Sequence, residues 1–356
     1  MHRTKKYIAI FILFLLFWNY QNNSVKAASA VTIDKQNFPD VAIRKAAKKY
    51  DVNRDGKLSV REIKEIRQIK LHVKGAITSF KGLQYFTNLR ALYYYGGGIF
   101  DGKSVEQAGK TETLKLSGCK KLRILYLRGN IKKIFIKHPK SVKKIQIYNN
   151  ACTTLNLSAY TQAETIYVQS NSITKLKLPE NSSVRDLRLG LFTMKKLHLK
   201  EMDKLWRVEI RGNNTLKVSM EGLDKLERAL VNDIAVLKVK NCVRLCKLRI
   251  YDMQKGDIVL NGCTNIDAVE VRGSTLKRLN LQNLKRLVYL DLGTSTKIQT
   301  LYLKGTVYEK EYYDKKINEQ TKGFYTTVRF PYAVKEQKLF AIMKLKAENI
   351  GKIEWN

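Results

Sequence analysis

The sequence predicts a solenoid built mainly from β-strands, with two parallel β-ladders in each coil of about 21 residues and a small helical cap at the N-terminal end. Three observations predict this fold class. Aliphatic residues recur in one pattern through the middle of the chain, a second set of aliphatic pairs lies between them, and an acidic loop motif precedes the first repeat. A single coil of this kind exposes an apolar face, so only a stack of coils can bury it.

The first ladder is a pattern of apolar, two other, apolar, one other and apolar residues, followed in its clearest copies by two residues and an asparagine. It reads LRILYLRGN from residue 122, VKKIQIYNN from residue 142 and AETIYVQSN from residue 163. The central apolar residue falls at positions 125, 145, 166, 187, 208, 229, 248, 269 and 290, at intervals of 19 to 21 residues. Repeats of this length and pattern indicate a leucine-rich repeat solenoid.

The second ladder consists of apolar pairs separated by one residue, about 10 residues from the first ladder. Period-two alternation is typical of strands whose apolar side chains face a core. The spacing leaves no room for a helix within a coil, so two sheets should enclose one narrow core. The pairs are Leu114/Leu116, Ile134/Ile136, Leu155/Leu157, Leu176/Leu178, Leu197/Leu199, Leu216/Val218, Leu237/Val239, Ile258/Leu260, Leu279/Leu281 and Leu301/Leu303.

The first 27 residues are predicted to be a secretory signal peptide. A basic start precedes an apolar run of 12 residues, Tyr7 to Trp18, and small residues that suit cleavage after Ala27 or Ala30 follow. The run is shorter than the about 20 residues needed to span a bilayer. No second run of this kind follows, so we expect a secreted or bacterial cell-surface (extracellular) protein with no transmembrane segment after signal removal.

Residues 51–62, DVNRDGKLSVRE, carry the ligand spacing of an EF-hand-like calcium loop. Such a loop needs oxygen ligands at positions 1, 3, 5, 7, 9 and 12 and a glycine at position 6, which is Gly56 here. Apolar residues on both sides predict helices over 39–50 and from 59 onward, so a helix-loop-helix cap is expected over 31–70. The predicted Ca²⁺ ligands are Asp51, Asn53, Asp55, the carbonyl of Lys57, Ser59 and Glu62.

Two of these positions have a second explanation. Ser59 and Glu62 also fit a helix capping box, which needs no metal. The basic residues around the loop should weaken calcium binding, which an extracellular site tolerates because such modules bind with Kd values of about 10⁻⁴ to 10⁻³ M. We therefore expect calcium to stabilise the cap rather than to regulate it.

The leucine-rich repeat array is predicted to span 71–305, with an insertion at 95–112 and a C-terminal cap at 306–356. The insertion contains GGIFDGKS, Gly97 to Ser104, which matches the phosphate-binding pattern of nucleotide hydrolases. That motif requires a buried strand before it and the N-terminus of a long helix after it. The segment that follows here is only about two helical turns long before Leu114 begins a ladder strand, so no nucleotide binding is expected.

The five cysteines, at positions 119, 152, 242, 246 and 263, are too few to form a disulfide framework in so long a chain. Cys119, Cys242 and Cys263 each follow a second-ladder strand at the same interval. We expect them to pack inward at equivalent turns, because a thiol behaves there as a small apolar group.

The stretch ITSFKGLQYFTNLRAL, residues 77–92, together with the coils that follow it, resembles the secreted and surface leucine-rich repeat proteins of Gram-positive and gut bacteria. The preceding segment, residues 38–66, resembles the single calcium-loop helix pair that often precedes such arrays. The resemblance covers roughly residues 36–305 and implies the architecture and an extracellular setting, but no particular ligand. The chain departs from the family pattern in its basicity and in showing no LPxTG-type anchor, so covalent attachment to the wall is not expected.

The repeat register places tyrosine and arginine side chains on the outward side of the first-ladder sheet, which is expected to be concave. These residue types suit recognition of a protein or a glycan. The β-propensity of tyrosine is the alternative explanation. The candidate ligand-binding residues are Tyr126, Arg128, Tyr148, Tyr167, Arg188, Arg211, Arg249 and Tyr251, with Arg272 in the same series.

The outward side of the second ladder is predicted to carry a lysine stripe, in a chain with a formal net charge of +36. Rows about 4.8 Å apart repel one another, and a polyanion such as wall teichoic acid or a glycosaminoglycan would relieve that repulsion. A solvated face that only keeps the protein soluble is the alternative. The stripe comprises Lys133, Lys137, Lys175, Lys177, Lys196, Lys200, Lys217, Lys238, Lys240 and Arg278.

No recognised catalytic signature is present in the sequence. The histidines at 72, 138 and 198 belong to no HExxH motif, and no G-x-S-x-G motif occurs. The sequence therefore predicts a non-enzymatic, calcium-stabilised binding protein, such as an adhesin, that recognises an extracellular protein or glycan. Binding to an anionic wall polymer through the lysine stripe is the alternative, and a hydrolase with an unrecognised site is a third. No specific nucleic-acid binding is expected.

Overall fold

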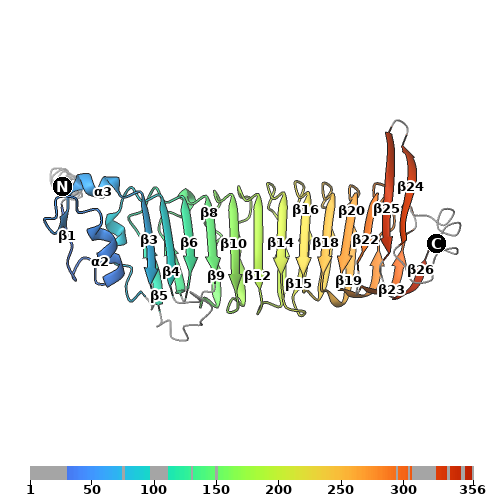
Figure 1. Ribbon diagram of the computed structural model, residues 1–356, viewed down its shortest axis with the longest axis horizontal. Coiled ribbons are helices and arrows are strands. Elements are labelled where there is room, and N and C mark those ends of the chain that lie inside the picture. Colours follow the sequence, from blue (N-terminus) through green and yellow to red (C-terminus); the bar gives the residue numbers. More distant parts are fainter. Residues whose placement is uncertain are drawn as a thin grey trace, which may run out of the picture.

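The computed structural model describes residues 30–73, 77–96, 111–129, 131–148, 151–293, 296–303, 305–306, 326–334, 337–345 and 349–354. The predicted signal peptide at 1–27, the stretch from Gly97 to Ser104 and most of the predicted insertion at 95–112 lie outside these residues. The described chain forms an elongated row of strands, with short helices at its N-terminal end (Figure 1). It is a parallel β-solenoid with few helices, as the repeat spacing predicts.

One side of the solenoid is a 13-stranded sheet. Its strands pair in parallel from β3 to β25, and β24 pairs antiparallel with β25 at the C-terminal end. In spatial order the strands are β3 (Gln68–Val73), β4 (Ala91–Gly96), β6 (Ile124–Arg128), β8 (Lys144–Tyr148), β10 (Thr165–Ser170), β12 (Asp186–Leu191), β14 (Arg207–Arg211), β16 (Arg228–Asn232), β18 (Lys247–Tyr251), β20 (Ala268–Arg272), β22 (Tyr289–Leu292), β25 (Gln337–Leu345) and β24 (Thr326–Val334).

The strand register confirms the first ladder read from the sequence. Leu125 pairs with Ile145, and Ile145 with Ile166. The same column continues through positions 187, 208, 229, 248, 269 and 290, and all of these side chains are buried. The column also extends toward the N-terminus, to Leu92 and Ile69. Strand β3 therefore spans the predicted boundary between the cap, which ends at residue 70, and the array, which starts at residue 71.

The opposite side of the solenoid is divided into three sheets in the described residues, although the sequence predicts one continuous ladder. The break after β11 has a local cause, because Pro179 follows that strand and has no N–H to donate to a neighbouring coil. The sheets are β5 (Thr111–Leu116) with β7 (Ile131–Ile136), β9 (Thr154–Asn156) with β11 (Lys175–Lys177), and a seven-stranded sheet of β13 (Lys196–Leu199), β15 (Lys217–Glu221), β17 (Val236–Lys240), β19 (Gln254–Asn261), β21 (Thr275–Asn280), β23 (Lys297–Tyr302) and β26 (Asn349–Glu354).

One rung of the second ladder differs from the prediction. Val218 pairs with Leu197 and Met220 with Leu199, so the inward pair is Val218/Met220 rather than Leu216/Val218. Leu216 is also buried, in the turn immediately before β15. An apolar turn residue next to a strand therefore imitated the period-two pattern.

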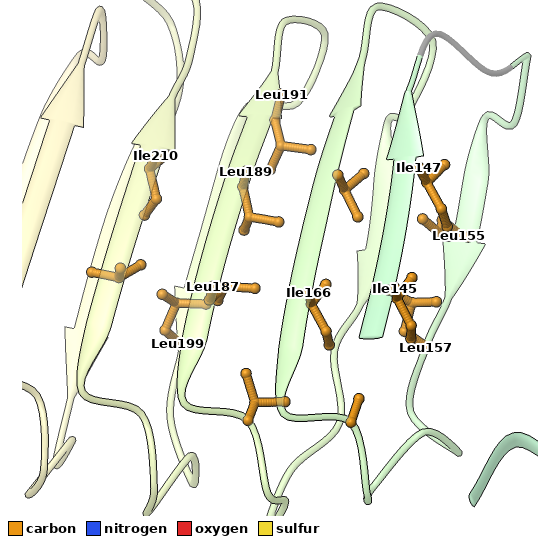
Figure 2. Close-up of a cluster of buried hydrophobic side chains, with 14 of the residues drawn as sticks. Ile145, Ile147, Leu155, Leu157, Ile166, Leu187, Leu189, Leu191, Leu199 and Ile210 are labelled. Carbon is orange, nitrogen blue, oxygen red and sulfur yellow. The ribbon is translucent and has the colours of Figure 1, made fainter. Parts of the chain in front are cut away.

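The core is a narrow apolar layer between the two sides. Figure 2 shows Leu187 and Leu189 from the 13-stranded sheet beside Leu199 from the opposite side, all buried. The cluster of buried side chains extends from Ile33 to Leu303. Burial of each large aliphatic side chain contributes about 1.5 to 3 kcal/mol, so contacts between neighbouring coils stabilise the array.

The buried cysteines lie at the turns, as the repeat register predicts. Cys119, Cys242 and Cys263 are each at most 1% exposed, and the Cys119 thiol donates to the carbonyl of Leu83 at 3.3 Å. Burial raises the pKa of Cys119 to about 12. The thiol therefore stays protonated at neutral pH and packs as a small apolar group.

On the side opposite the 13-stranded sheet, the turns after the strands from β11 to β23 share one backbone conformation. At intervals of 19 to 22 residues a residue adopts a positive φ between 44° and 72°, which is the left-handed region that favours glycine and, after it, asparagine. These residues are Asn181, Glu201, Gly222, Asn241, Gly262, Asn283 and Gly305. Glu201 is neither a glycine nor an asparagine.

Two short helices cover the N-terminal end of the solenoid: α2 (Val41–Lys48) and α3 (Val60–Glu65). Between them β2 (Lys57–Leu58) pairs antiparallel with β1 (Val31–Thr32). The Asp40 carboxylate caps α2 by accepting from the Ala42 N–H and also accepts from the Thr78 N–H of the first coil. This residue therefore ties the cap to the array.

The described parts of the C-terminal segment are strands. β24 and β25 extend the 13-stranded sheet, and β26 pairs with β23 at the end of the seven-stranded sheet. The segment predicted as a cap over 306–356 thus continues both sides of the solenoid where the structure describes it.

Candidate recognition surfaces

Tyrosine side chains gather on the outward side of the first strands of the 13-stranded sheet. Each coil contributes at most two of these tyrosines, which form two columns that run across the strands. Neighbouring strands are about 4.8 Å apart. We call this surface the tyrosine face, and its members are Tyr93 and Tyr95 on β4, Tyr126 on β6, Tyr148 on β8 and Tyr167 on β10.

The five rings form one continuous row of contacts. The ring centroids of Tyr95 and Tyr126 are 4.9 Å apart, those of Tyr126 and Tyr148 are 5.3 Å apart, and those of Tyr148 and Tyr167 are 4.8 Å apart. Tyr93 also contacts Tyr126 at 6.0 Å. Neighbouring rings restrain one another at these distances, so the face presents a rigid aromatic surface.

The row continues to His72 on β3, whose ring stacks on that of Tyr95 with centroids 4.5 Å apart and planes 6° from parallel. At the other end, the hydroxyl of Tyr167 donates to the Gln169 side chain at 3.3 Å. Burial, with the neighbouring tyrosines as a second cause, raises the pKa values of Tyr95 and Tyr148. The hydroxyls of these two rings therefore remain protonated and able to donate to a ligand at neutral pH.

Three members of this surface were missed in the sequence analysis: His72, Tyr93 and Tyr95. The signal was present, because all three alternate with inward residues of β3 and β4. They were missed because the predicted cap boundary after residue 70 divides β3, the predicted insertion from residue 95 divides β4, and the first ladder was read only from residue 125 onward.

The outward side of the later strands in the same sheet is ionic rather than aromatic. The Glu270 carboxylate lies 2.7 Å from the Arg272 guanidinium and 3.1 Å from that of Arg249. Arg272 also contacts Asp291 at 3.0 Å. These carboxylates and guanidinium groups neutralise one another.

The structure divides the predicted ligand-binding residues between these two surfaces. Tyr126, Arg128, Tyr148 and Tyr167 lie on adjacent strands, and Arg188 is the cross-strand neighbour of Tyr167. The remaining residues lie in the ionic half. Arg211 lies 3.9 Å from Glu209, Arg249 is paired with Glu270, and the Tyr251 hydroxyl donates to Glu270 at 3.0 Å.

The lysine stripe is exposed along its whole predicted length, but it is distributed over three sheets. Two of its columns are interrupted: His198, Ser219 and Lys238 form one, and Lys200, Glu221 and Lys240 another. Three of its cations lie beside carboxylates, in the pairs Lys200–Glu201 at 2.8 Å, Lys240–Glu221 at 2.9 Å and Arg278–Asp257 at 3.4 Å.

The loop predicted to bind calcium has the backbone turn that the motif requires. Gly56 has a φ of 78°, and its N–H donates to the Asp51 carboxylate at 3.0 Å. Leu58, at loop position 8, is buried and pairs with Val31. The loop is thus joined to the chain's own first strand, where paired EF-hand loops would join each other.

The carboxylate of Glu62, at loop position 12, accepts hydrogen bonds from this loop. One oxygen accepts from the Val52 N–H at 2.7 Å, and the other accepts from the Ser59 N–H at 2.8 Å and from the Ser59 hydroxyl at 2.7 Å. The Ser59 hydroxyl in turn accepts from the Glu62 N–H, so the predicted capping box is present. Within the described residues, no group of three or more His, Cys, Asp or Glu side chains is arranged to hold a metal ion.

A serine and a histidine lie in hydrogen-bond contact on the second side of the solenoid. The Nδ1 atom of His198 is 2.6 Å from the Ser219 hydroxyl, between strands β13 and β15. The contact between the two side chains is exposed to solvent.

Strand order, register and core together define a leucine-rich repeat solenoid. No family model matches the chain, and no curated protein matches it. Among solved structures, the chain is similar to the internalin InlF of Listeria monocytogenes at 15% identity and a TM-score of 0.48, over 79% of this chain and 86% of that one. It is also similar to the functional domain of InlJ from Listeria monocytogenes, which includes a cysteine ladder, at 14% identity and a TM-score of 0.36, over 78% and 73% of the two chains.

In the part of the chain that the structure describes, no helix is long and apolar enough to cross a membrane.

Proposed function

We propose that this chain is an exported, non-enzymatic binding protein whose tyrosine face recognises an extracellular protein or glycan. The observation that carries the proposal is the unbroken row of ring contacts from Tyr95 to Tyr167. Tyrosine supplies a large apolar area and a polar hydroxyl while losing little conformational freedom on binding, which is why it is enriched in binding hot spots.

The β-propensity of tyrosine alone does not account for this surface. Propensity acts on every strand, yet the equivalent outward positions farther along the sheet hold Glu209, Arg249 and Glu270. The contacts between tyrosine rings join consecutive coils at one end, whereas Tyr251 and Tyr289 farther along the sheet bond to carboxylates. Such confinement supports a local recognition surface.

Two alternative functions have weaker support. The His198–Ser219 pair has the residues of a hydrolytic dyad, but its contact is exposed to solvent on the outward side of two strands. The proposal that a polyanion binds along the lysine stripe is weaker because Lys200 and Lys240 are paired with glutamates, which reduce the positive charge of the stripe.

We also propose that Ca²⁺ stabilises the N-terminal cap at the loop over residues 51–62. The ligand set read from the sequence and the left-handed turn at Gly56 support this proposal. The ion would be held by the carboxylates of Asp51, Asp55 and Glu62 with the other predicted ligands. At a calcium concentration ten times the Kd, binding would stabilise the cap by about 1.4 kcal/mol. Melting with calcium and with a chelator tests this role.

The tyrosine face is tested by substitution and a ligand array. The full chain without residues 1–27 is applied to an array of glycans and extracellular proteins, and the affinity for the ligand found is measured by calorimetry. The double variant Tyr126→Ala/Tyr148→Ala removes two central rings, so we expect binding about 30-fold weaker or more, since each hot-spot truncation costs about 1 to 2 kcal/mol.

The matched control is Tyr251→Ala/Tyr289→Ala, which removes two tyrosines from the ionic half of the same sheet. It should leave the affinity within about twofold. Equal losses in both double variants, with unchanged melting, would contradict the proposal.

A further inference from the structure

A basic pocket of about 370 Å³ lies beside the turns that lead into strands β4, β6 and β8. Six of its lining residues are cations: Arg90, Lys120, Lys121, Arg123, Lys140 and Lys143. The other two, Ser141 and Gln162, are neutral. None of the predicted site residues belongs to this pocket, and it lies at the edge of the sheet rather than on the lysine stripe.

The backbone holds these cations in successive coils. The Arg123 N–H donates to the Arg90 carbonyl at 2.7 Å, and the Lys143 N–H donates to the Arg123 carbonyl at 2.8 Å. Buried side chains next to them, Leu122 and Val142, fix the turns against the core. The main chains of these three residues therefore lie about 4.8 Å apart from coil to coil, which keeps their charges close enough to repel one another within a Debye length.

Few carboxylates neutralise this cluster. In the described part of the chain, one of the six pocket cations forms an ion pair: the Lys143 ammonium lies 3.3 Å from the Glu164 carboxylate. The Lys121 ammonium donates to the neutral side chain of Asn88 at 2.7 Å. An anion bound in the pocket would relieve the mutual repulsion of the remaining charges.

The cationic run is a local feature and not a property of the repeat. The backbone column that holds Arg90, Arg123 and Lys143 continues through Glu164, Arg185, Trp206, Glu227, Cys246 and Asp267 in the later coils. Beyond β8 this column therefore holds acidic, aromatic and neutral residues, with Arg185 as the single cation among those named. The overall charge of +36 does not explain this difference between coils.

We propose that this pocket binds the sulfate or phosphate groups of an extracellular anionic polysaccharide. Two arginine guanidinium groups can each give paired hydrogen bonds to a tetrahedral oxyanion, while the lysines act as point charges around it. The pocket is open to solvent and its cations span three coils, so consecutive anionic groups of a polymer can be held together.

The neighbouring tyrosine face favours a polysaccharide over a single-stranded nucleic acid. Arg90 and Arg123 each precede a tyrosine of that face by three residues, about 10 Å along the strand. The tyrosine rings already contact one another at 4.8 to 6.0 Å, which leaves no slot for a base between them. The rings are half-buried, and their exposed parts can contact the apolar face of a sugar.

This inference rests on the proposed function only for its extracellular setting. Loss of the array ligand in the Tyr126→Ala/Tyr148→Ala variant reports on the tyrosine face. Loss of polyanion binding in a pocket variant reports on the pocket. Either proposal can therefore fail without the other.

The test compares two triple variants that lose the same charge. The pocket variant is Lys120→Gln/Lys121→Gln/Lys140→Gln, and the control, Lys204→Gln/Lys225→Gln/Lys285→Gln, changes exposed lysines in turns of later coils. Because all six side chains are exposed, both variants should have the same melting temperature as the wild type. Affinity is measured at several salt concentrations for heparin, for a phosphodiester-linked wall teichoic acid, for polyglutamate and for single-stranded DNA.

We expect heparin, teichoic acid or both to bind the wild type. The pocket variant should bind the same polymer at least about tenfold more weakly. The slope of log K against log salt concentration should be smaller in magnitude by about two to three. The arm that responds identifies sulfate or phosphate as the natural group. The control variant should stay within about twofold of the wild type.

Three results would overturn the proposal. The first is an equal loss in both triple variants, which would show that only the diffuse charge matters. The second is binding of polyglutamate or single-stranded DNA as tight as that of either polysaccharide. The third is the absence of any loss in the pocket variant or in a second variant, Arg123→Gln/Lys140→Gln, that removes one of the arginines.

Discussion

Glu62 shows how one side chain joins the cap's helix to its loop. Its carboxylate accepts from the Ser59 hydroxyl, the Ser59 N–H and the Val52 N–H, and these hydrogen bonds lower its pKa from the ordinary value of 4.5. A carboxyl group with a lowered folded-state pKa stabilises the fold above its unfolded pKa and loses that contribution as the pH falls through the folded pKa. The cap should therefore weaken in acid.

The variant Glu62→Gln separates this effect from other carboxylates, because an amide offers one acceptor oxygen and does not titrate. In a chelator, we expect the wild type to melt above the variant at pH 7 and the two melting temperatures to converge as the pH falls below 4.5 and through the lowered folded-state pKa. In about 10 mM CaCl₂ at pH 7 the wild type should melt higher still, and the variant should not respond. A constant difference across the pH range would contradict the hydrogen-bond account, and an equal calcium response in both chains would contradict the calcium proposal.

At the scale of the structural element, the repeated left-handed turn after strands β11 to β23 restricts which residues fit there. Gly222 and Glu201 occupy equivalent turns with φ values of 61° and 52°. Only the glycine adopts this conformation without strain. The ion pair between Glu201 and Lys200 is exposed and compensates little.

Exchange at these two turns should therefore have opposite effects. We expect Glu201→Gly to stabilise the chain by about 0.5 to 1 kcal/mol and Gly222→Ala to destabilise it by about 1 kcal/mol. A Cβ at Gly222 would meet no atom within 4 Å, so the second change isolates backbone strain from packing. Urea denaturation measures both, and a destabilised Glu201→Gly chain would show that the side chain, and not the backbone, sets this turn.

Strands were predictable from the sequence because burial repeats at fixed positions. The column from Leu125 to Leu290 appears in the structure in the same register, since aliphatic residues that alternate with polar ones leave one solution for each coil. Two features could not be predicted in this way: the buried turn residue Leu216, which imitates a strand residue, and the interruption of the second ladder near Pro179. The first depends on how the turn before β15 packs, and the second on pairing between coils.

The candidate surfaces were less predictable than the strands. Tyr126, Tyr148 and Tyr167 could be placed on one face from the register, but their ring contacts and their separation from Arg211 and Arg249 depend on how many coils lie between them. The basic pocket draws its cations from separate turns that only stacking brings together. Such sites depend on tertiary structure, which the repeat pattern does not contain.

At the scale of the whole molecule, the solenoid presents one long sheet with two different outward surfaces. The aromatic surface lies over β4 to β10, toward the N-terminal cap, and the ionic surface lies over the later strands (Figure 1). Because each coil packs on its neighbours, side chains on adjacent strands keep a fixed spacing. A ligand therefore meets a surface that is already ordered, which reduces the entropy lost on binding.

The central claim is that the aromatic part of this sheet is where a ligand docks. Hydroxyl-radical footprinting of the full chain, with and without the ligand that the array identifies, tests this most directly because tyrosines on both surfaces report in one molecule. We expect ligand to protect Tyr93, Tyr95, Tyr126, Tyr148 and Tyr167 from oxidation and to leave Tyr251 and Tyr289 as reactive as in the free protein. Protection of Tyr251 and Tyr289, with the five tyrosines unchanged, would contradict the claim.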